Sequence, residues 1–299
     1  MERPSLSLGP VTVFFGNKNG KYPDGNQVMV SGRSARALFD TPLSSNWADP
    51  ALEGCDLVLL GHAHEDHTAA LHRHPGAEVW APHQDLAAIQ STQGMLAHYG
   101  YDPEATALMR QKLLREFHFH PRPDARGYGD GHVWDLGGVT VRALHMPGHT
   151  RGHSVLLVEP GGIAFIGDID LSGFGPYYGD GCSDLREFIT TLERIEHLQA
   201  RVWITYHHKG VITERETFDS LLAAFRQRLV QREEALLAAL TPPGRTLEEL
   251  VTRRFVYPPD FQEVFVAAVE RKTISEHLSL LREQGRILTE GERFLRQAG

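Results

Sequence analysis

Short apolar runs separated by turn residues dominate the first two thirds of the chain. Three early runs rich in β-branched and aromatic residues alternate with clusters of Gly, Asn, Pro and Asp, and each predicts a strand: residues 11–15, 27–30 and 36–40. Residues 56–61 follow as a continuous apolar stretch, which is typical of a strand buried on both faces. The segment that begins at His62 therefore lies at the carboxyl end of a buried strand.

Further along the chain, predicted strands alternate with predicted helices. The strands are residues 78–81, 139–143, 154–158, 163–166 and 202–205, and the helices are residues 85–95, 102–115 and 184–197. This order indicates a layered α/β sandwich in which helices cover the sheets. The Pro- and Gly-rich residues 120–131 fit either a lid or a plain connection.

The last third of the chain has a different pattern, with helical periodicity and few strand signals. Three Thr-x-x-Glu capping boxes, which begin at Thr213, Thr246 and Thr273, predict three helix starts, and Gly285 predicts a stop. Residues 286–295 then read as a hairpin that turns at Glu290 and Gly291. We therefore expect two domains, residues 1–212 and a small, mostly helical winged-helix domain over residues 213–299.

Length and composition narrow the class of protein. The 299 residues are 41% hydrophobic and 23% charged with a net charge of −8, which predicts a soluble globular chain and disfavours tight binding to nucleic acid. No apolar stretch approaches the roughly 18 residues needed to span a bilayer, and residues 1–4 lack a secretory pattern, so we expect a cytoplasmic protein with no membrane partner. Cys55 and Cys182 are too few for a disulfide framework and are expected to be buried thiols.

The 17 histidines include a dense cluster directly after the buried strand. His62-Ala63-His64-Glu65-Asp66-His67 is a pattern that independent positions of this composition would give in roughly 0.3% of such chains, so coincidence explains it poorly. Imidazole and carboxylate groups suit Zn²⁺, Fe²⁺ or Mn²⁺. At strand spacing His62 and His64 point to the same side, and the bend after them directs Asp66 and His67 to a second position.

Three more candidates stand at predicted strand ends or turns. His149 lies in a Pro-Gly-His-Thr turn, Asp168 follows the strand over residues 163–166, and the pair His207-His208 follows the strand over residues 202–205. Because a layered α/β fold gathers its strand ends at one edge, we expect these distant segments to converge on one metal centre.

Together these motifs resemble the metallo-β-lactamase superfamily, in the subset without a cysteine ligand, over residues 10–212. The resemblance rests on His62-x-His64-x-Asp66-His67, on residues 146–153, on Gly167-Asp168 and on the late histidine. It implies an αββα sandwich with two divalent ions, most simply Zn²⁺, with Fe²⁺ or Mn²⁺ as alternatives. In that pattern His62, His64 and His149 hold the first ion, Asp66, His67 and His208 hold the second, and Asp168 bridges them. His208 matches the pattern better than His207 because Lys209-Gly210-Val211-Ile212 follows it.

The implied chemistry is hydrolysis of a small-molecule substrate. A hydroxide held between two divalent ions is available near pH 7, since such sites lower the pKa of water from 15.7 to about 7. Asp66 would orient this nucleophile and pass a proton to the leaving group. Residues from Asp184 onward resemble the corresponding stretch of glyoxalase II, so the first hypothesis is cleavage of an ester or thioester.

Other residues have simpler explanations. Tyr177 and Tyr178 fit a substrate wall or a loop packed on its own aromatic rings. His153 is expected to fix its loop through a hydrogen bond, and Glu65 to be a solvated charge. Surface or packing roles are expected for His72, His74, His83, His98, His118, His120, His132, His145, His197 and His277.

Three alternative functions remain open from the sequence. The C-terminal pattern resembles the beta-lactamase-like subgroup that includes the mitochondrial endoribonuclease of animals, which suggests cleavage of single-stranded RNA by the same metal centre. A mononuclear-iron persulfide dioxygenase uses a similar sandwich, and a DNA-binding module would use the tail alone. Residues 213–299 hold 13 Lys and Arg against 14 Asp and Glu, which favours packing or homodimer formation through this domain over nucleic-acid binding.

Overall fold

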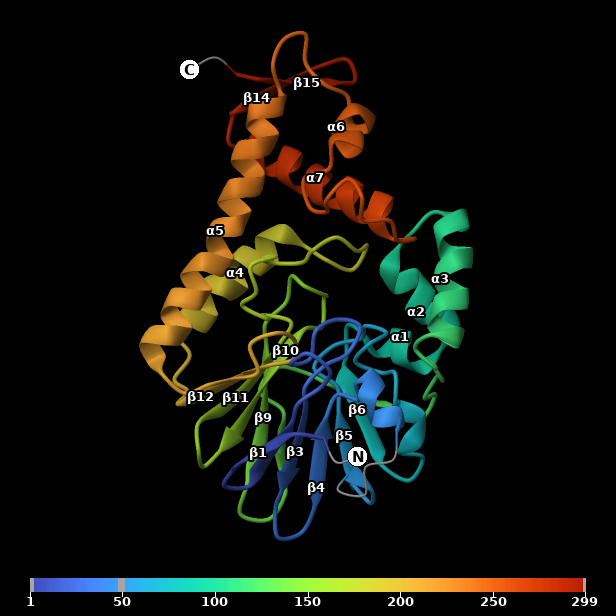
Figure 1. The fold of residues 1–299 in the computed structure, drawn as a ribbon, viewed down its shortest axis with the longest axis vertical. Coiled ribbons are helices and arrows are strands. Elements are labelled where there is room, and N and C mark those ends of the chain that lie inside the picture. Colours follow the sequence, from blue (N-terminus) through green and yellow to red (C-terminus); the bar gives the residue numbers. More distant parts are fainter. Residues whose placement is uncertain (1–2, 48–51, 298–299) are drawn as a thin grey trace.

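Two β-sheets packed face to face form the body of the molecule, and helices cover their outer faces (Figure 1). The computed structural model describes residues 3–47 and 52–297. The predicted lack of a secretory pattern concerns residues 1–4, of which Met1 and Glu2 lie outside the described residues. Within the described residues, no helix has the length and apolar character needed to cross a membrane.

The first sheet follows chain order and is mixed. Among the described residues it contains β1 (Ser5–Leu8), β2 (Val11–Phe14), β3 (Gln27–Ser31), β4 (Arg36–Phe39), β5 (Leu57–Leu59), β6 (Glu78–Pro82) and β7 (Arg126–Tyr128). The strands from β1 to β4 pair antiparallel, and those from β4 to β7 pair parallel. The carboxyl ends of β4, β5 and β6 therefore meet at one edge.

The second sheet is mainly antiparallel. In the order of its strands within the described residues, it contains β13 (Val211–Ile212), β12 (Val202–Thr205), β11 (Ile163–Gly167), β10 (Ser154–Glu159), β9 (Thr140–His145) and β8 (Val133–Asp135). Only β11 and β12 pair parallel among these strands, so Asp168 and the segment after Thr205 leave the sheet at the same edge.

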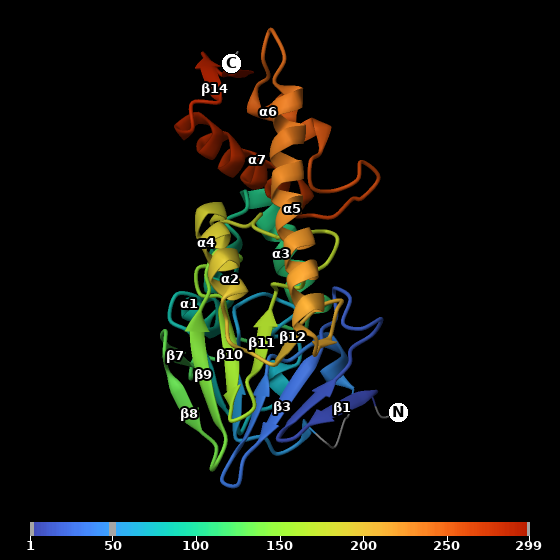
Figure 2. The same ribbon diagram turned by 90° about the vertical axis from the view of Figure 1, so that its left-hand side faces the viewer.

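Three apolar layers hold the sandwich together. Val28, Leu59, Leu156 and Phe165 are fully buried members of the layer between the sheets. A second layer packs the first sheet under α1 (Leu86–Gln90), α2 (Thr92–Tyr99) and α3 (Pro103–Arg115). A third packs the second sheet under α4 (Leu185–Glu196) and the start of α5 (Arg215–Ala239), as Figure 2 shows from the side. The described chain is thus the αββα arrangement that the resemblance implies.

Most predicted elements of the sandwich are confirmed. The helix predicted over residues 85–95 is two helices, because Ser91 leaves the helical conformation and its hydroxyl caps α2 at the Gly94 amide. The helix predicted over residues 102–115 is α3, which Asp102 caps through its side chain at the Ala105 amide. Residues 120–131 contain β7, so this stretch is a connection with an edge strand rather than a lid.

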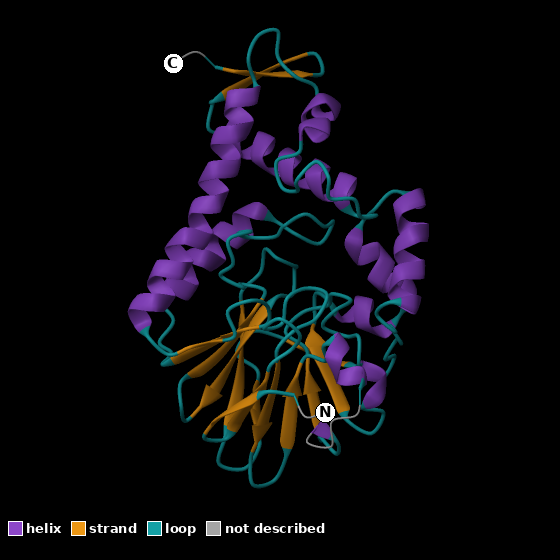
Figure 3. Cartoon of the chain, in the orientation of Figure 1, coloured by secondary structure: helices purple, strands orange, loops and turns teal. Residues whose placement is uncertain are grey.

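The C-terminal third contains α5, α6 (Leu247–Arg253), α7 (Val266–Glu283) and the hairpin of β14 (Ile287–Glu290) and β15 (Arg293–Arg296) (Figure 3). The capping box at Thr246 is confirmed. The other two boxes are wrong, since Glu214 is the N-cap of α5 without a side-chain hydrogen bond, and Thr273 is a buried residue within α7. Three helices and a hairpin are present as predicted, while the winged-helix assignment stays a prediction.

The domain boundary after residue 212 also stays a prediction, but the core crosses it. Phe218, Leu222 and Phe225 of α5 belong to the third apolar layer of the sandwich. Phe265 and Val269 pack against Tyr101 and Tyr177 in a separate cluster. The C-terminal third therefore packs on the sandwich through several of its elements, among them α5 and the residues around Phe265.

Candidate active site

Seven histidine and aspartate side chains gather where the strands of both sheets end. They come from the segment after β5, the loop before β10, the segment after β11 and the segment after β12. We call this set the cluster: His62, His64, Asp66, His67, His149, Asp168 and His207. All of its imidazoles are buried, and Asp168 is the most open member with a side chain 14% exposed.

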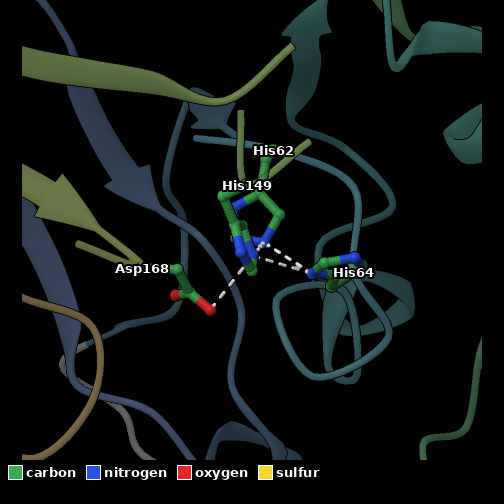
Figure 4. Close-up of side chains that lie close together, drawn as sticks. All are labelled: His62, His64, His149 and Asp168. Atoms are coloured by element: carbon green, nitrogen blue, oxygen red, sulfur yellow. Dashed lines mark hydrogen bonds and ion pairs between the residues drawn. The ribbon is translucent and has the colours of Figure 1, made fainter. Parts of the chain in front are cut away.

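Three imidazoles of the cluster point at one another. His62 Nε2 lies 3.1 Å from His64 Nδ1, and His149 Nε2 lies 3.2 Å from the first and 3.0 Å from the second (Figure 4). The Asp168 carboxylate approaches the same point, with Oδ2 3.3 Å from His149 Nε2. The predicted convergence of His62, His64, His149 and Asp168 is therefore observed.

A second group lies beside the first. His207 Nε2 is 3.1 Å from Asp66 Oδ2, and His67 Nε2 is 3.9 Å from the same oxygen. Asp168 reaches this group as well, because its Oδ1 lies 3.0 Å from His67 Nε2 and its Oδ2 lies 3.7 Å from His207 Nε2. Asp168 thus stands between the two groups.

The prediction of His208 as the last member is wrong in this structure, where His207 takes that place. The His207 Nδ1–H donates to the Gly20 carbonyl at 2.7 Å, which turns Nε2 toward Asp66. His208 has a positive φ of 61°, and its half-exposed ring lies 3.6 Å from Asp170. The prediction rested on the residues that follow His208 in the sequence. Those residues do not indicate the positive φ of His208.

Buried acceptors fix the ring orientations from behind, and sequence reasoning missed the acidic ones. Asp40, at the end of β4, accepts from His67 Nδ1 at 2.7 Å, and Asp180 lies 3.2 Å from His64 Nε2. His149 Nδ1–H donates to the Tyr177 carbonyl at 2.9 Å. Such partners select the tautomer that leaves the other nitrogen free. Asp40 could have been found, because it ends a strand whose carboxyl end lies at this edge.

His153 has the loop-fixing role that was predicted. Its Nδ1–H donates to the Met146 carbonyl at 2.9 Å, and its Nε2 accepts the Asp168 N–H at 3.2 Å. Burial, and then the nearby His149, lower the pKa of His153 to about 3, so the ring is neutral at pH 7. A neutral ring is required here, since one nitrogen donates while the other accepts.

The charges of the cluster depend strongly on one another. Burial alone would lower the pKa of His67, but the Asp168 and Asp40 carboxylates hold it well above its usual value. Burial likewise opposes protonation of His207, but Asp168 and Asp66 raise the pKa of that imidazole to about 9. The pKa of Asp168 lies well below its usual value, because His207 and His67 outweigh the effect of burial. These directions favour charged His67 and His207 beside ionised Asp168 at neutral pH.

A cavity of about 420 Å³ opens onto the cluster. Its lining is rich in aromatic rings: Tyr22, Tyr99, Tyr101, Phe174, Tyr177, Tyr257, Phe261 and Phe265. Tyr177 lines the cavity as predicted. The substrate-wall alternative is wrong for Tyr178, because its ring is buried and its hydroxyl lies 2.8 Å from His277 Nε2, so that it does not line the cavity.

The prediction of Glu65 as a solvated charge is also wrong. Its side chain is buried at the cavity wall, where it accepts hydrogen bonds from the hydroxyls of Tyr22 and Tyr99. Tyr22 and Tyr99 come from segments distant from Glu65 in the sequence. The place of Glu65 between His64 and Asp66 therefore did not indicate these hydrogen bonds. His98, which is half-buried, and Cys182, which is buried, lie beside His64 and form a further group with it.

The donor atoms of the cluster fit divalent metal ions. His67 Nε2, Asp66 Oδ2 and Asp168 Oδ1 are buried, and none of them has a hydrogen bond of acceptable geometry within the described residues. His67 Nε2 and Asp168 Oδ1 lie 3.0 Å apart, which is within hydrogen-bond distance, but their angles do not fit a hydrogen bond. Both atoms therefore point toward a common space. Buried polar atoms without partners are costly, and a bound cation would satisfy them.

Comparison with known proteins gives relatives of one fold. An atrochrysone carboxyl ACP thioesterase of Claviceps purpurea is 31% identical over 259 residues, which cover 79% of this chain and 69% of that protein. A metallo-beta-lactamase family protein from Thermus thermophilus superposes with a TM-score of 0.69 at 25% identity, over 97% of this chain and 99% of that one. This chain belongs to the metallo-β-lactamase superfamily. The predicted assignment to this superfamily is confirmed.

Two further relatives of this superfamily member match over shorter parts. An atrochrysone carboxyl ACP thioesterase of Aspergillus fumigatus is 32% identical over 72% of this chain, and a hydroxyacylglutathione hydrolase of Haemophilus influenzae is 29% identical over 39% of it. The chain spans 56% and 50% of the lengths of these two proteins. No family model matches the chain.

Proposed function

We propose that this metallo-β-lactamase superfamily protein is a dinuclear metal hydrolase that cleaves the acyl bond of a thioester or ester. The observation that carries the proposal is the position of the cluster: ligand atoms from four separate loops meet at one end of an aromatic cavity. Relatives named as a thioesterase and as a hydroxyacylglutathione hydrolase support acyl chemistry over other reactions of the fold.

Each group of the cluster would hold one ion. His62, His64 and His149 would bind the first, Asp66, His67 and His207 the second, and Asp168 both, a glyoxalase II-like ligand set. Zn²⁺ is the simplest choice for nitrogen and oxygen ligands, with Fe²⁺ or Mn²⁺ as alternatives. When bound, such ions lower the pKa of water and polarise the carbonyl oxygen of the substrate.

Asp66 is the proton carrier in this proposal. Burial raises its pKa, but the neighbouring His67 and His207 more than offset this and hold the pKa of the Asp66 carboxyl below its usual value. The ionised carboxylate can accept the proton of the attacking water as the C–O bond forms. It can then give that proton to the sulfur or oxygen of the leaving group as the acyl bond breaks.

The cavity suits an acyl substrate better than a nucleic acid. Lys21 is the one Lys or Arg side chain among the described residues that line it, whereas Glu65, Asp66, Asp168, Asp170 and Asp180 supply carboxylates. A single-stranded RNA groove combines aromatic rings with clustered cations, so the endoribonuclease alternative lacks half of its recognition chemistry here. The two groups of ligand atoms likewise support two ions over a single iron.

The test is an assay of the 299-residue chain loaded with Zn²⁺ against acyl thioesters and esters of varied chain length. We expect turnover that a chelator abolishes and added Zn²⁺ restores. Absence of turnover across the panel, with hydrolysis of single-stranded RNA instead, would overturn the proposal. Cytoplasmic location, homodimer formation and a winged-helix role for the C-terminal third stay predictions.

A further inference from the structure

Part of the lining of the cavity above the cluster comes from a segment of the C-terminal third. Residues 254–265, which we call the roof segment, connect α6 to α7 and bring Tyr257, Phe261 and Phe265 to the cavity lining. The rings pack on one another: Tyr257 and Phe261 stack with centroids 5.0 Å apart, and Phe174 lies 5.5 Å from Tyr257. The roof segment thus presents ring surface to the space over the cluster.

A buried carboxylate clamps the roof segment. Glu270 of α7 has no exposed surface, and its oxygens accept the backbone N–H groups of Phe255 at 2.8 Å, Val256 at 3.0 Å and Tyr257 at 2.9 Å. Three charge-assisted hydrogen bonds to consecutive amides fix a segment that has no helix or strand of its own. At the other end, Glu263 pairs with Lys112 of α3 at 2.8 Å.

The rest of the lining offers rings but few free polar groups. The hydroxyls of Tyr22 and Tyr99 donate to Glu65, and those of Tyr101 and Tyr177 donate to Asp180 at 2.6 and 3.2 Å. Four phenols are therefore already bonded to the protein's own carboxylates, and these two carboxylates are shielded in return. A ligand in the cavity meets mainly ring faces and edges.

Phe261 is 39% exposed and belongs to the lining. Large aromatic rings that serve only the core are buried away from water. An aromatic ring left exposed at a cavity is instead typical of a ligand-binding surface.

We propose that the roof segment, clamped by Glu270, is the acyl-binding wall of this site, and that the site selects thioesters whose acyl group carries an aromatic ring and no charge. This inference rests on the proposed acyl hydrolysis and adds the substrate class. Ring stacking on Tyr257 and Phe261 would supply the affinity, since offset and edge-to-face ring pairs add attraction beyond that of their buried area. Glu270 is a positioning residue in this account.

The experiment compares two N-acetylcysteamine thioesters, 2-naphthoyl and acetyl, on the Zn²⁺-loaded chain. We expect the ratio of their kcat/KM values to favour 2-naphthoyl by at least roughly tenfold, as one or two ring contacts allow. Phe261→Ala should lower that ratio by roughly tenfold through KM, with kcat for either substrate changed by less than about threefold. Leu288→Ala, which removes an exposed side chain on the C-terminal hairpin, is the matched control and should leave both substrates unchanged.

Glu270→Gln should raise KM for the 2-naphthoyl thioester and leave kcat for the acetyl thioester near the original value, because it loosens the wall and not the cluster. An unselective enzyme, or a Phe261→Ala variant that loses both substrates equally, would overturn the inference and leave the proposed hydrolysis intact.

A binding measurement separates the two proposals if neither thioester is cleaved. Neutral 2-naphthamide, followed by its fluorescence on the metal-free chain, should bind, and Phe261→Ala should weaken that binding by roughly tenfold. That result would retain the aromatic wall and reject the hydrolase. No binding, or equal binding to the variant and the Leu288→Ala control, would reject the wall.

Discussion

The cluster and the roof segment face the same cavity but are built in opposite ways. Each ring of His67, His149 and His207 is fixed by a buried hydrogen-bond acceptor behind it, at 2.7 to 2.9 Å. The roof segment has no regular structure, and it is held by ring stacking, by the Glu270 clamp and by the Glu263–Lys112 pair. The difference teaches that the strand ends gather the ligand-type atoms, while the C-terminal third adds Tyr257, Phe261 and Phe265 to a cavity lining that the loops of the sandwich otherwise supply.

The largest effect is expected from a pair of adjacent histidines. His207→Ala should reduce activity by more than about a hundredfold, because it removes a ligand atom rather than a partner behind one. His208→Ala removes a half-exposed ring outside the cluster and serves as the matched control, with a change of less than about threefold expected. Steady-state kinetics on the two Zn²⁺-loaded variants decides which of the two histidines is the ligand. The reverse order of effects would restore His208 as the ligand.

The next effect concerns a partner behind the cluster. Asp40→Asn removes the charge that His67 Nδ1 faces at 2.7 Å, and we expect metal affinity to fall by about 10- to 100-fold. Competition with a chromophoric chelator measures this change. Asp219→Asn, on the exposed face of α5, should leave metal affinity as it is. Equal affinities of the Asp40 variant and the unaltered chain would show that the orientation of this ring is set by packing alone.

A smaller effect should appear in the C-terminal third as acid stability. Burial, and then the nearby Arg232, lower the pKa of His277 to about 4. The unfolded chain, with an ordinary imidazole pKa of about 6.5, binds this proton first as the pH falls, so the folded state loses stability below that value. Between pH 7 and pH 5 the loss from this residue is about 2 kcal/mol.

Urea unfolding of the unaltered chain and of His277→Gln at both pH values tests this difference. The unaltered chain should lose about 2 kcal/mol more than the variant. Identical losses would mean that His277 is protonated in the folded chain, or that its contacts with Tyr178 open before unfolding.

The smallest predicted effect is at the start of α6. Thr246→Ala removes the hydroxyl that caps the Glu249 amide, and we expect the free energy of unfolding to fall by about 1 kcal/mol. Thr252→Ala, near the end of the same helix, is the control. Hydrogen exchange would locate the loss in the C-terminal third if that part opens separately, and a loss spread over the sandwich would show that the two regions unfold together.

The sequence was informative where local pattern and chemistry agree. Periodicity located the strands, and the density of ligand-type residues in residues 62–67 located most of the cluster. It was uninformative where contacts join distant segments, as for Asp180 behind His64 and the clamp of Glu270 on Tyr257. The residues that follow His208 favoured it over His207. They do not reveal the positive φ of His208, which turns its ring away from the cluster. Capping boxes failed at Thr213 and Thr273, since a Thr and a Glu at this spacing can match the pattern without a helix start at the Thr.

Anomalous X-ray diffraction at the zinc absorption edge, on crystals of the chain purified with Zn²⁺, tests the central claim most directly. The account predicts two peaks per chain, one within coordination distance of His62 Nε2, His64 Nδ1 and His149 Nε2, the other of Asp66, His67 and His207, with Asp168 reaching both. A single peak, or peaks that include His208 and leave His207 unbound, would contradict it.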